Sequence, residues 1–149
     1  QPLPDDVGER PLDVPLPEGC KALDPKVMNP FTSGLSVRST RGSLIEPRGA
    51  PAWFRIERDM IAGAAVSQAM RAAVAADFCN TSSPLDFHAW RFLNADLTVS
   101  LAREPVGDWI LLNAETWIGP DGAGIAAGRL GDRLGYFVRA VQSLVIEKR

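Results

Sequence analysis

Segments in which apolar and polar side chains alternate recur along the chain, and such alternation is typical of β-strands that bury one face. Residues 34–41 and 52–58 alternate in this way, and a turn-like Glu-Pro-Arg-Gly sequence at 46–49 separates them. Four further strands are predicted in quick succession, at residues 91–102, 108–118, 123–131 and 135–147. The short, Gly- and Pro-containing connections between these four favour antiparallel neighbours.

One segment between the strands has a different pattern. Residues 61–78 are rich in alanine, contain no proline and include the helix-favouring Gln68, Met70 and Arg71. An Asn-Thr-Ser-Ser-Pro sequence follows at 80–84, in which the asparagine tolerates left-handed backbone and the proline cannot continue a helix. The pattern predicts one helix of about 14 to 18 residues.

The order of these segments predicts the fold class. Two strands, one helix and a four-strand meander favour a single antiparallel sheet, of five or six strands, wrapped around one long helix. This α+β arrangement is the hot dog architecture. We expect it to occupy residues 31–149.

The first 30 residues differ from the rest in composition. Seven prolines lie within them, a density that opposes both helices and sheet ladders and favours extended backbone. We expect residues 1–30 to be a proline-rich linker or a strap on the surface. Because the chain begins at Gln1 with such a segment, we also expect that a preceding part has been removed.

Composition and charge exclude several classes of partner. The chain has 149 residues, of which 46% are hydrophobic, so one domain with a real core is expected. The net charge is -2 and the basic residues are scattered, which argues against nucleic acid and membrane surfaces as partners. No apolar run is long enough to span a bilayer. Cys20 and Cys79 have neither metal-ligand nor redox spacing, so a reducing, cytoplasmic location is expected.

Asp77 occupies a position where an apolar residue is expected. Val66, Met70, Ala73 and Asp77 follow helical spacing and would share one face of the predicted helix. One interpretation is a semi-buried carboxylate that acts as a general base. The alternative is that the stripe ends before residue 77 and that Asp77 is a solvated carboxylate at the helix end.

Gln142 interrupts an apolar row in the last predicted strand. With period two it shares a face with Tyr136, Val138, Ala140, Leu144 and Ile146. A buried amide without a partner costs about 1 to 3 kcal/mol, so something must bond it. The alternative is an edge position from which Gln142 reaches solvent.

Asn94 is the weakest candidate by pattern. Leu93, Ala95, Leu97, Val99 and Leu101 form the apolar face of strand 91–102, so simple alternation points Asn94 away from the helix. A functional role requires a bulge near the start of the strand, or a site on the other side of the sheet.

Other chemistries find little support. His88 is the only histidine, so a histidine metal cluster is excluded, and it lies in a loop-like segment that suggests a surface or packing role. Cys79 has no signature of a catalytic thiol and is expected to be a small buried hydrophobe. We therefore expect neither a metal nor a cofactor.

Four ordered motifs carry a family resemblance: residues 75–78 (AADF), 94–99 (NADLTV), 109–112 (WILL) and 139–144 (RAVQSL). With these motifs the chain resembles the acyl-CoA thioesterase II family, and more closely its actinobacterial branch, from about Phe31 to the end. The resemblance implies a double hot dog protein of which this chain is the carboxy-terminal repeat. It also implies acyl-CoA as substrate and a second hot dog domain as partner, covalent, cleaved or on another chain, in an oligomer.

The resemblance also implies site residues. Family members position the attacking water with an Asp on the helix, a Gln on the last strand and a Thr or Ser early in the strand after the helix, which correspond here to Asp77, Gln142 and Asn94. Asn94 departs from the hydroxyl pattern. The implied reaction is direct hydrolysis of a fatty acyl thioester without a metal, with a backbone N–H stabilising the oxyanion. The acyl chain would lie in an apolar tunnel shaped by Val66, Met70 and Phe78.

A different class of function stays open. The departure at Asn94 is consistent with a catalytically silent hot dog that binds acyl-CoA or scaffolds its partner half. A hot dog dehydratase is disfavoured, because His88 lies outside the helix where that chemistry needs its base.

Overall fold

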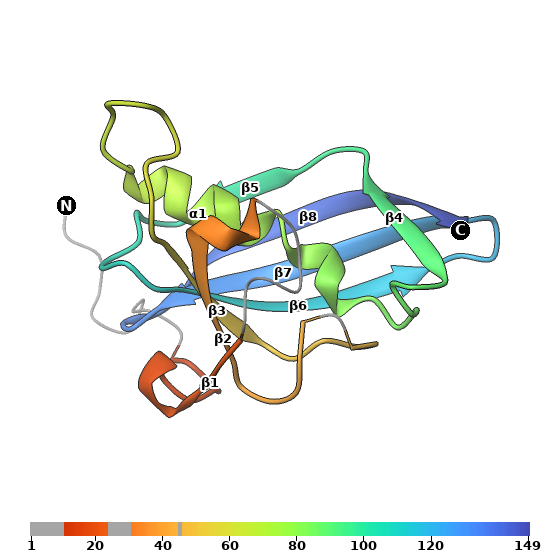
Figure 1. Cartoon of the computed structure of the whole chain (residues 1–149), viewed down its shortest axis with the longest axis horizontal. Helices are drawn as coiled ribbons and strands as arrows, with labels where there is room; N and C mark the ends of the chain where they lie inside the picture. The colour runs from red at the N-terminus through yellow and green to blue at the C-terminus, as the bar shows by residue number, and fades with distance from the viewer. Residues whose placement is uncertain (1–10, 24–30, 45) are drawn as a thin grey trace.

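A single curved sheet with helices on one face makes up the structure, a computed structural model that describes residues 11–23, 31–44 and 46–149 (Figure 1). Within these residues the sheet has eight strands, all paired antiparallel, in the order β1-β2-β3-β6-β7-β8-β4, with β5 also paired to β8. The strands are β1 (Lys21–Ala22), β2 (Leu35–Ser39), β3 (Ala52–Ile56), β4 (Trp90–Asn94), β5 (Thr98–Leu101), β6 (Ile110–Ile118), β7 (Ala123–Asp132) and β8 (Gly135–Lys148). The predicted hot dog fold class is confirmed. The predicted number of five or six strands was too low, because β1 forms within the proline-rich segment and the predicted strand 91–102 divides into β4 and β5.

The one α-helix of the described residues, α1 (Gln68–Ala76), is shorter than predicted. Ser67 ends the preceding coil and caps the helix, because its side chain accepts a hydrogen bond from Met70 N at 3.1 Å. Residues 61–64 form a turn instead of a first helical turn, with Gly63 at a φ of 74°. The predicted start at residue 61 was therefore wrong. A 3-10 helix, η5 (Cys79–Ser82), follows α1 after two residues.

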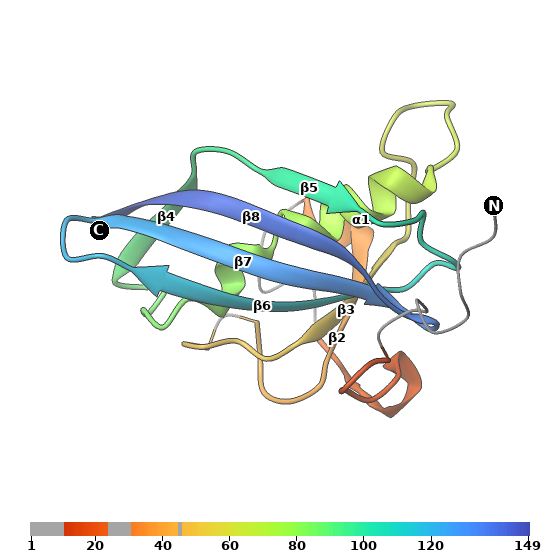
Figure 2. The same ribbon diagram turned by 180° about the vertical axis from the view of Figure 1, so that it is seen from behind.

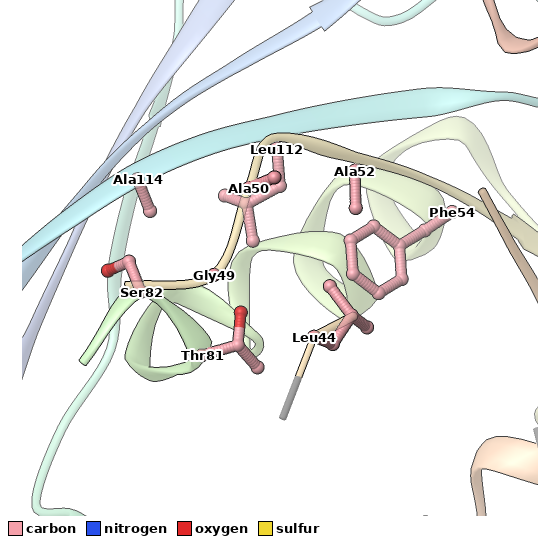
Figure 3. A pocket seen from close by; sticks show the side chains of 9 residues that line it. All are labelled: Leu44, Gly49, Ala50, Ala52, Phe54, Thr81, Ser82, Leu112 and Ala114. Carbon is pink, nitrogen blue, oxygen red and sulfur yellow. The ribbon is translucent and has the colours of Figure 1, made fainter. Parts of the chain in front are cut away.

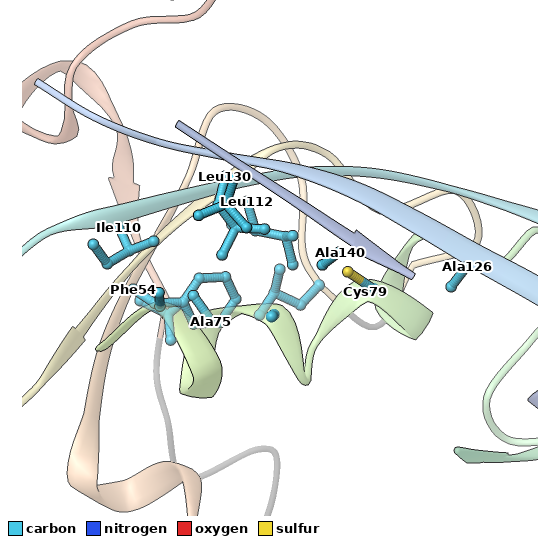
Figure 4. Close-up of a cluster of buried hydrophobic side chains, with 14 of the residues drawn as sticks. Phe54, Ala75, Cys79, Ile110, Leu112, Ala126, Leu130 and Ala140 are labelled. Atoms are coloured by element: carbon cyan, nitrogen blue, oxygen red, sulfur yellow. The ribbon is translucent and has the colours of Figure 1, made fainter. Parts of the chain in front are cut away.

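The hydrophobic core lies between α1 with η5 and the concave face of the sheet (Figure 4). The buried residues of the helix are Ala72, Ala75 and Ala76, and these small side chains let helix and sheet approach closely, with Val74 packed at the margin of the core. Gly128 of β7 shows how close that approach is. A Cβ built there would lie 2.7 Å from Cys79 Sγ. Figure 2 shows the opposite face, with β6, β7 and β8 in front of the helix.

The described part of the proline-rich segment lies against the sheet. It contains the 3-10 helix η2 (Pro17–Gly19) and the two-residue strand β1, which pairs with β2, so the expectation that this segment forms no ladder was wrong there. Trp53 of β3 is fully buried, and its indole N–H donates to Pro15 O at 2.9 Å. Residues 1–10 and 24–30 lie outside the described residues, and the domain boundary at residue 30 stays a prediction.

Two irregularities in the sheet decide which side chains face the helix. The β7–β8 register shifts between Leu130 and Gly131: Leu130 pairs with Val138, whereas Gly131 pairs with Tyr136. The extra residue on β8 removes Tyr136 from the row of side chains that faces the helix. The prediction that Tyr136 shares a face with Gln142 was therefore wrong, and its hydroxyl donates to Asp13 of the strap. The second irregularity divides the predicted strand 91–102 into β4 and β5, and it belongs to the candidate site.

Candidate active site

The C-terminus of α1 places Asp77. Asp77 is the C-cap residue, and its backbone N–H still bonds to Ala73 O at 3.1 Å, so the carboxylate leaves the helix from its last turn. The predicted apolar stripe is not the reason for its position. Val66 lies before the helix and Ala73 is exposed, and the buried face of α1 is a different one. Asp77 itself is exposed in this chain, which corrects the expectation of a semi-buried carboxylate.

Asn94 faces the helix because the edge of the sheet contains a bulge. Asn94 pairs with Leu144 and Thr98 pairs with Val141, so the chain advances four residues along β4 and β5 while β8 advances three. The extra residue reverses the alternation. The side chain of Asp96 stabilises this bulge, since its carboxylate accepts from Ser143 N at 2.8 Å and from Ser143 Oγ at 2.9 Å. These two bonds lower the pKa of Asp96.

Asn94 therefore points toward Asp77, against the simple alternation. Its Nδ2 donates to Asp77 Oδ1 at 3.2 Å and reaches Asp77 O at 3.5 Å. Leu144, its partner on β8, is buried in the core, which confirms the side of the sheet that residue 94 faces.

Gln142 is the only amide among the fully buried side chains of β8. It lies in the middle of the strand and not at an edge, with β7 as its neighbour. Its Nε2 donates to Asp77 O at 3.1 Å and to Asp77 Oδ1 at 3.4 Å. Its Oε1 is buried and has no hydrogen-bond partner among the described residues.

The structure thus brings together the three residues that were singled out from the sequence. Side chains from the end of α1, the end of β4 and the middle of β8 meet at one carboxylate oxygen, Asp77 Oδ1. The other oxygen, Asp77 Oδ2, accepts no hydrogen bond from any residue that the structure describes. An ionised carboxylate held on one oxygen and open on the other can take a proton from a bound water.

One further residue joins this cluster and was missed by the sequence reasoning. Asn80 of η5 donates from Nδ2 to Asn94 Oδ1 at 3.0 Å. In the sequence, Asn80 stands out only as part of a helix end signal. Asn80 lies three residues after Asp77, and residues three apart share one side of a tight helical turn. That spacing was the signal that could have identified it.

The predicted acyl-chain residues lie in different surroundings. Phe78 stacks on Phe54 with ring centroids 4.8 Å apart, Val66 packs against the margin of the core, and Met70 is half-buried in the first turn of α1. Their role as substrate contacts stays a prediction.

A separate small pocket, with a cavity volume of only about 10 Å³, lies on the other side of η5, between η5, the segment around Gly49 and strands β3 and β6 (Figure 3). Its walls are Leu44, Gly49, Ala50, Ala52, Phe54, Thr81, Ser82, Leu112 and Ala114. The hydroxyls of Thr81 and Ser82 donate to Phe78 O and Cys79 O, at 2.8 and 2.9 Å. Both hydroxyls are thus engaged in hydrogen bonds within the 3-10 helix turn, and the other lining residues are apolar or glycine.

Thiol and metal chemistry find no support at this site. Burial raises the pKa of Cys79 to about 12, and the Asp77 carboxylate adds to this, so the thiol stays protonated. Among residues 11–23, 31–44 and 46–149, no group of three or more His, Cys, Asp or Glu side chains could hold a metal ion. No helix in the same ranges is long and apolar enough to cross a membrane.

Comparison with solved structures identifies the class of fold. The chain is similar to a protein with the hot dog fold from Alicyclobacillus acidocaldarius, at 16% identity and a TM-score of 0.66 over 91% of this chain and 54% of that one. It is also similar to a protein assigned as a thioesterase II from Thermobifida fusca (14%, TM-score 0.67, 98% and 57%) and to the acyl-CoA thioesterase II TesB2 from Mycobacterium marinum (12%, 0.62, 93% and 56%). At these identities the likeness is one of fold, and the chain spans a little over half the length of these proteins.

A family model for the acyl-CoA thioesterase C-terminal domain matches residues 4–146. The chain belongs to this family, as the resemblance in its motifs implied. Among curated protein sequences, none matches it significantly.

Proposed function

We propose that this chain hydrolyses fatty acyl-CoA thioesters to free fatty acid and CoA, as the carboxy-terminal half of a double hot dog enzyme. The observation that carries the proposal is the Asp77 carboxylate, held on Oδ1 by Asn94 and Gln142 and open on Oδ2. Family membership supports the substrate class.

In the proposed reaction Asp77 is the general base. Asp77 Oδ2 takes a proton from water while the water oxygen bonds to the thioester carbonyl carbon. The tetrahedral intermediate then collapses to the free fatty acid, the carbon–sulfur bond breaks, and the CoA thiolate takes up the proton from Asp77, which restores the carboxylate. No metal or covalent intermediate is needed. A general base contributes about 100-fold to 10,000-fold to such a step.

Gln142 and Asn94 have different roles in this proposal. Gln142 is fully buried and contacts the carboxylate and carbonyl of Asp77, so it is a positioning residue that fixes the base. Asn94 is exposed, and its amide nitrogen carries two N–H groups. One N–H bonds to Asp77 Oδ1, and the other can hold the attacking water beside Oδ2. We retain Val66, Met70 and Phe78 as proposed contacts of the acyl chain.

A second hot dog domain completes the proposed site. Asp77 and Asn94 are exposed here, whereas water is best excluded around a reacting thioester. Strands β4 and β5 end the sheet on the same side, with Leu93 46% and Leu101 42% exposed. A partner that covers this edge would bury the two leucines and, with them, Asp77 and Asn94. Sedimentation should then show assembly at micromolar concentration, and a stable monomer would contradict the pairing.

We also propose a reducing, cytoplasmic location, which the free thiols of Cys20 and Cys79 support.

One observation favours a second candidate function. The family places a hydroxyl where this chain has Asn94, so the domain could bind acyl-CoA without hydrolysing it. The two functions are separated by incubating the assembled protein with acyl-CoA of several chain lengths and following free thiol, beside calorimetric binding. Thiol release above the buffer rate supports hydrolysis. Binding without thiol release for every chain length supports the silent function.

A further inference from the structure

An asparagine next to a catalytic carboxylate needs a partner that fixes its orientation. An ionised carboxylate only accepts hydrogen bonds, so Asn94 must present its NH2 group and not its oxygen to Asp77. The two ends of an amide have almost the same shape, so shape alone does not select the productive orientation. A threonine or serine at the same position has no such ambiguity, because one oxygen atom both donates and accepts and its hydrogen rotates toward the acceptor.

Asn80 supplies that partner. Its NH2 group donates to Asn94 Oδ1 at 3.0 Å, which leaves Asn94 Nδ2 on the side of Asp77 Oδ1. The reversed orientation of Asn94 would set its NH2 against that of Asn80 and its oxygen against the carboxylate. Both contacts favour the same orientation. The hydrogen bonds therefore run in one direction, from Asn80 to Asn94 and from Asn94 to Asp77.

The fold holds Asn80 in place. Asp77 and Asn80 are three residues apart, and the tight turn between α1 and η5 brings both to the end of β4. Figure 1 shows η5 between α1 and β4. Backbone hydrogen bonds support this turn, from Thr81 N to Phe78 O at 2.9 Å and from Ser83 N to Asn80 O at 3.1 Å. Asn80 itself is half-buried.

We propose that Asn80 is a positioning residue, which sets the orientation of the Asn94 amide and so allows an asparagine to replace the hydroxyl at this position. This inference rests on the proposed function of Asp77 as the base. It deepens that function by adding a residue that acts through Asn94 and touches neither the water nor the thioester.

The test is a double-mutant cycle in the intact protein in its native assembly, with acyl-CoA as substrate. Asn80→Ala should lower kcat about five- to tenfold, the value of one hydrogen bond, with little change in KM. The same substitution in the Asn94→Thr background should change kcat less than twofold, because a hydroxyl needs no orienting partner. A residue that only stabilises the fold would cause the same loss in both backgrounds.

Two further variants keep the test independent of folding. Asn80→Asp has the same shape but accepts where Asn80 donates, so it should lower kcat more than Asn80→Ala does. Ser82→Ala removes a hydroxyl from the same 3-10 helix without touching Asn94. It should lower the melting temperature and leave kcat unchanged.

Three results would overturn the role of Asn80: kcat within twofold of wild type for Asn80→Ala, an equal loss in the Asn94→Thr background, or an equal loss in Ser82→Ala. Asp77→Asn, measured alongside, separates this inference from the proposed function. If Asp77→Asn retains hydrolysis, the proposed function itself fails. If Asp77→Asn is inactive and Asn80→Ala is normal, only the role of Asn80 fails.

Discussion

Replacing Gln142 by leucine separates the stability of this domain from its activity. Gln142 is fully buried in an apolar row between Ala140 and Leu144, opposite Ala126. The substitution removes one NH2 group that bonds to Asp77 at 3.1 and 3.4 Å. A typical net contribution of such hydrogen bonding is about 0.5 to 1.5 kcal/mol.

The same substitution also removes an unfavourable contribution to the free energy of folding. Gln142 Oε1 is buried without a partner among the described residues, and an unsatisfied buried acceptor costs about 1 to 3 kcal/mol. Leucine has a similar volume and suits the apolar row. The two effects nearly cancel, so the free energy of unfolding of Gln142→Leu should lie within about 1 kcal/mol of wild type. Gln142→Ala, which also leaves a cavity, should be less stable by about 2 kcal/mol or more.

Activity should respond differently. Without the amide the Asp77 carboxylate loses one of its two side-chain donors, and misplacement of a reacting group by about 1 Å costs on the order of 100-fold. Urea denaturation and thiol-release kinetics on the same preparation measure both quantities. A loss of stability above about 2 kcal/mol, or hydrolysis within twofold of wild type, would refute the reasoning.

Three further predictions follow from the site and its support. Asn94→Thr restores the family's hydroxyl at a position that faces Asp77, so kcat for acyl-CoA should be preserved or raised; a tenfold loss would contradict this. Asp132 is fully buried, and burial raises its pKa. The hydrogen bonds from Arg103 and from the backbone N–H groups of Val106 and Leu134, together with the Arg103 charge, outweigh that effect and hold the pKa below the ordinary value of 3.8. The unfolded chain therefore takes up this proton first as the pH falls, so stability should drop through and below about pH 4 in wild type. The drop should be shallower in Asp132→Asn, whose unfolding free energy at pH 7 should be lower by about 3 kcal/mol in urea titrations. Gly128→Ala should destabilise by about 1 to 3 kcal/mol, because the new Cβ meets Cys79 Sγ, and an unchanged melting temperature would show that the contact relaxes.

The strands were the most predictable part of the fold. Alternation is a local property, and it located β2, β3, β6, β7 and β8 to within a few residues. The start of the helix was less predictable, because an alanine-rich composition continues through Gly63 and Ser67. The left-handed turn at Gly63 and the cap at Ser67 decide where the helix begins, and neither changes the average propensity of the segment.

The site was predictable only in part, for physical reasons that differ from residue to residue. Gln142 disturbs a regular row, so it could be found from one strand alone. The direction of Asn94 depends on one extra residue relative to β8, and a bulge is defined only by pairing with a partner strand. Asn80 has no pattern of its own, and its importance arises from the three-dimensional contact with Asn94.

The most direct test of the central claim is Asp77→Asn, which keeps the shape of the side chain and removes the proton acceptor. Two quantities should be measured on the assembled protein: the rate of thiol release from a saturating acyl-CoA, and the calorimetric affinity for the same substrate. The account predicts a fall in kcat of about 100-fold to 10,000-fold with affinity nearly unchanged. A fall of only two- or threefold would contradict the assignment of Asp77 as the general base.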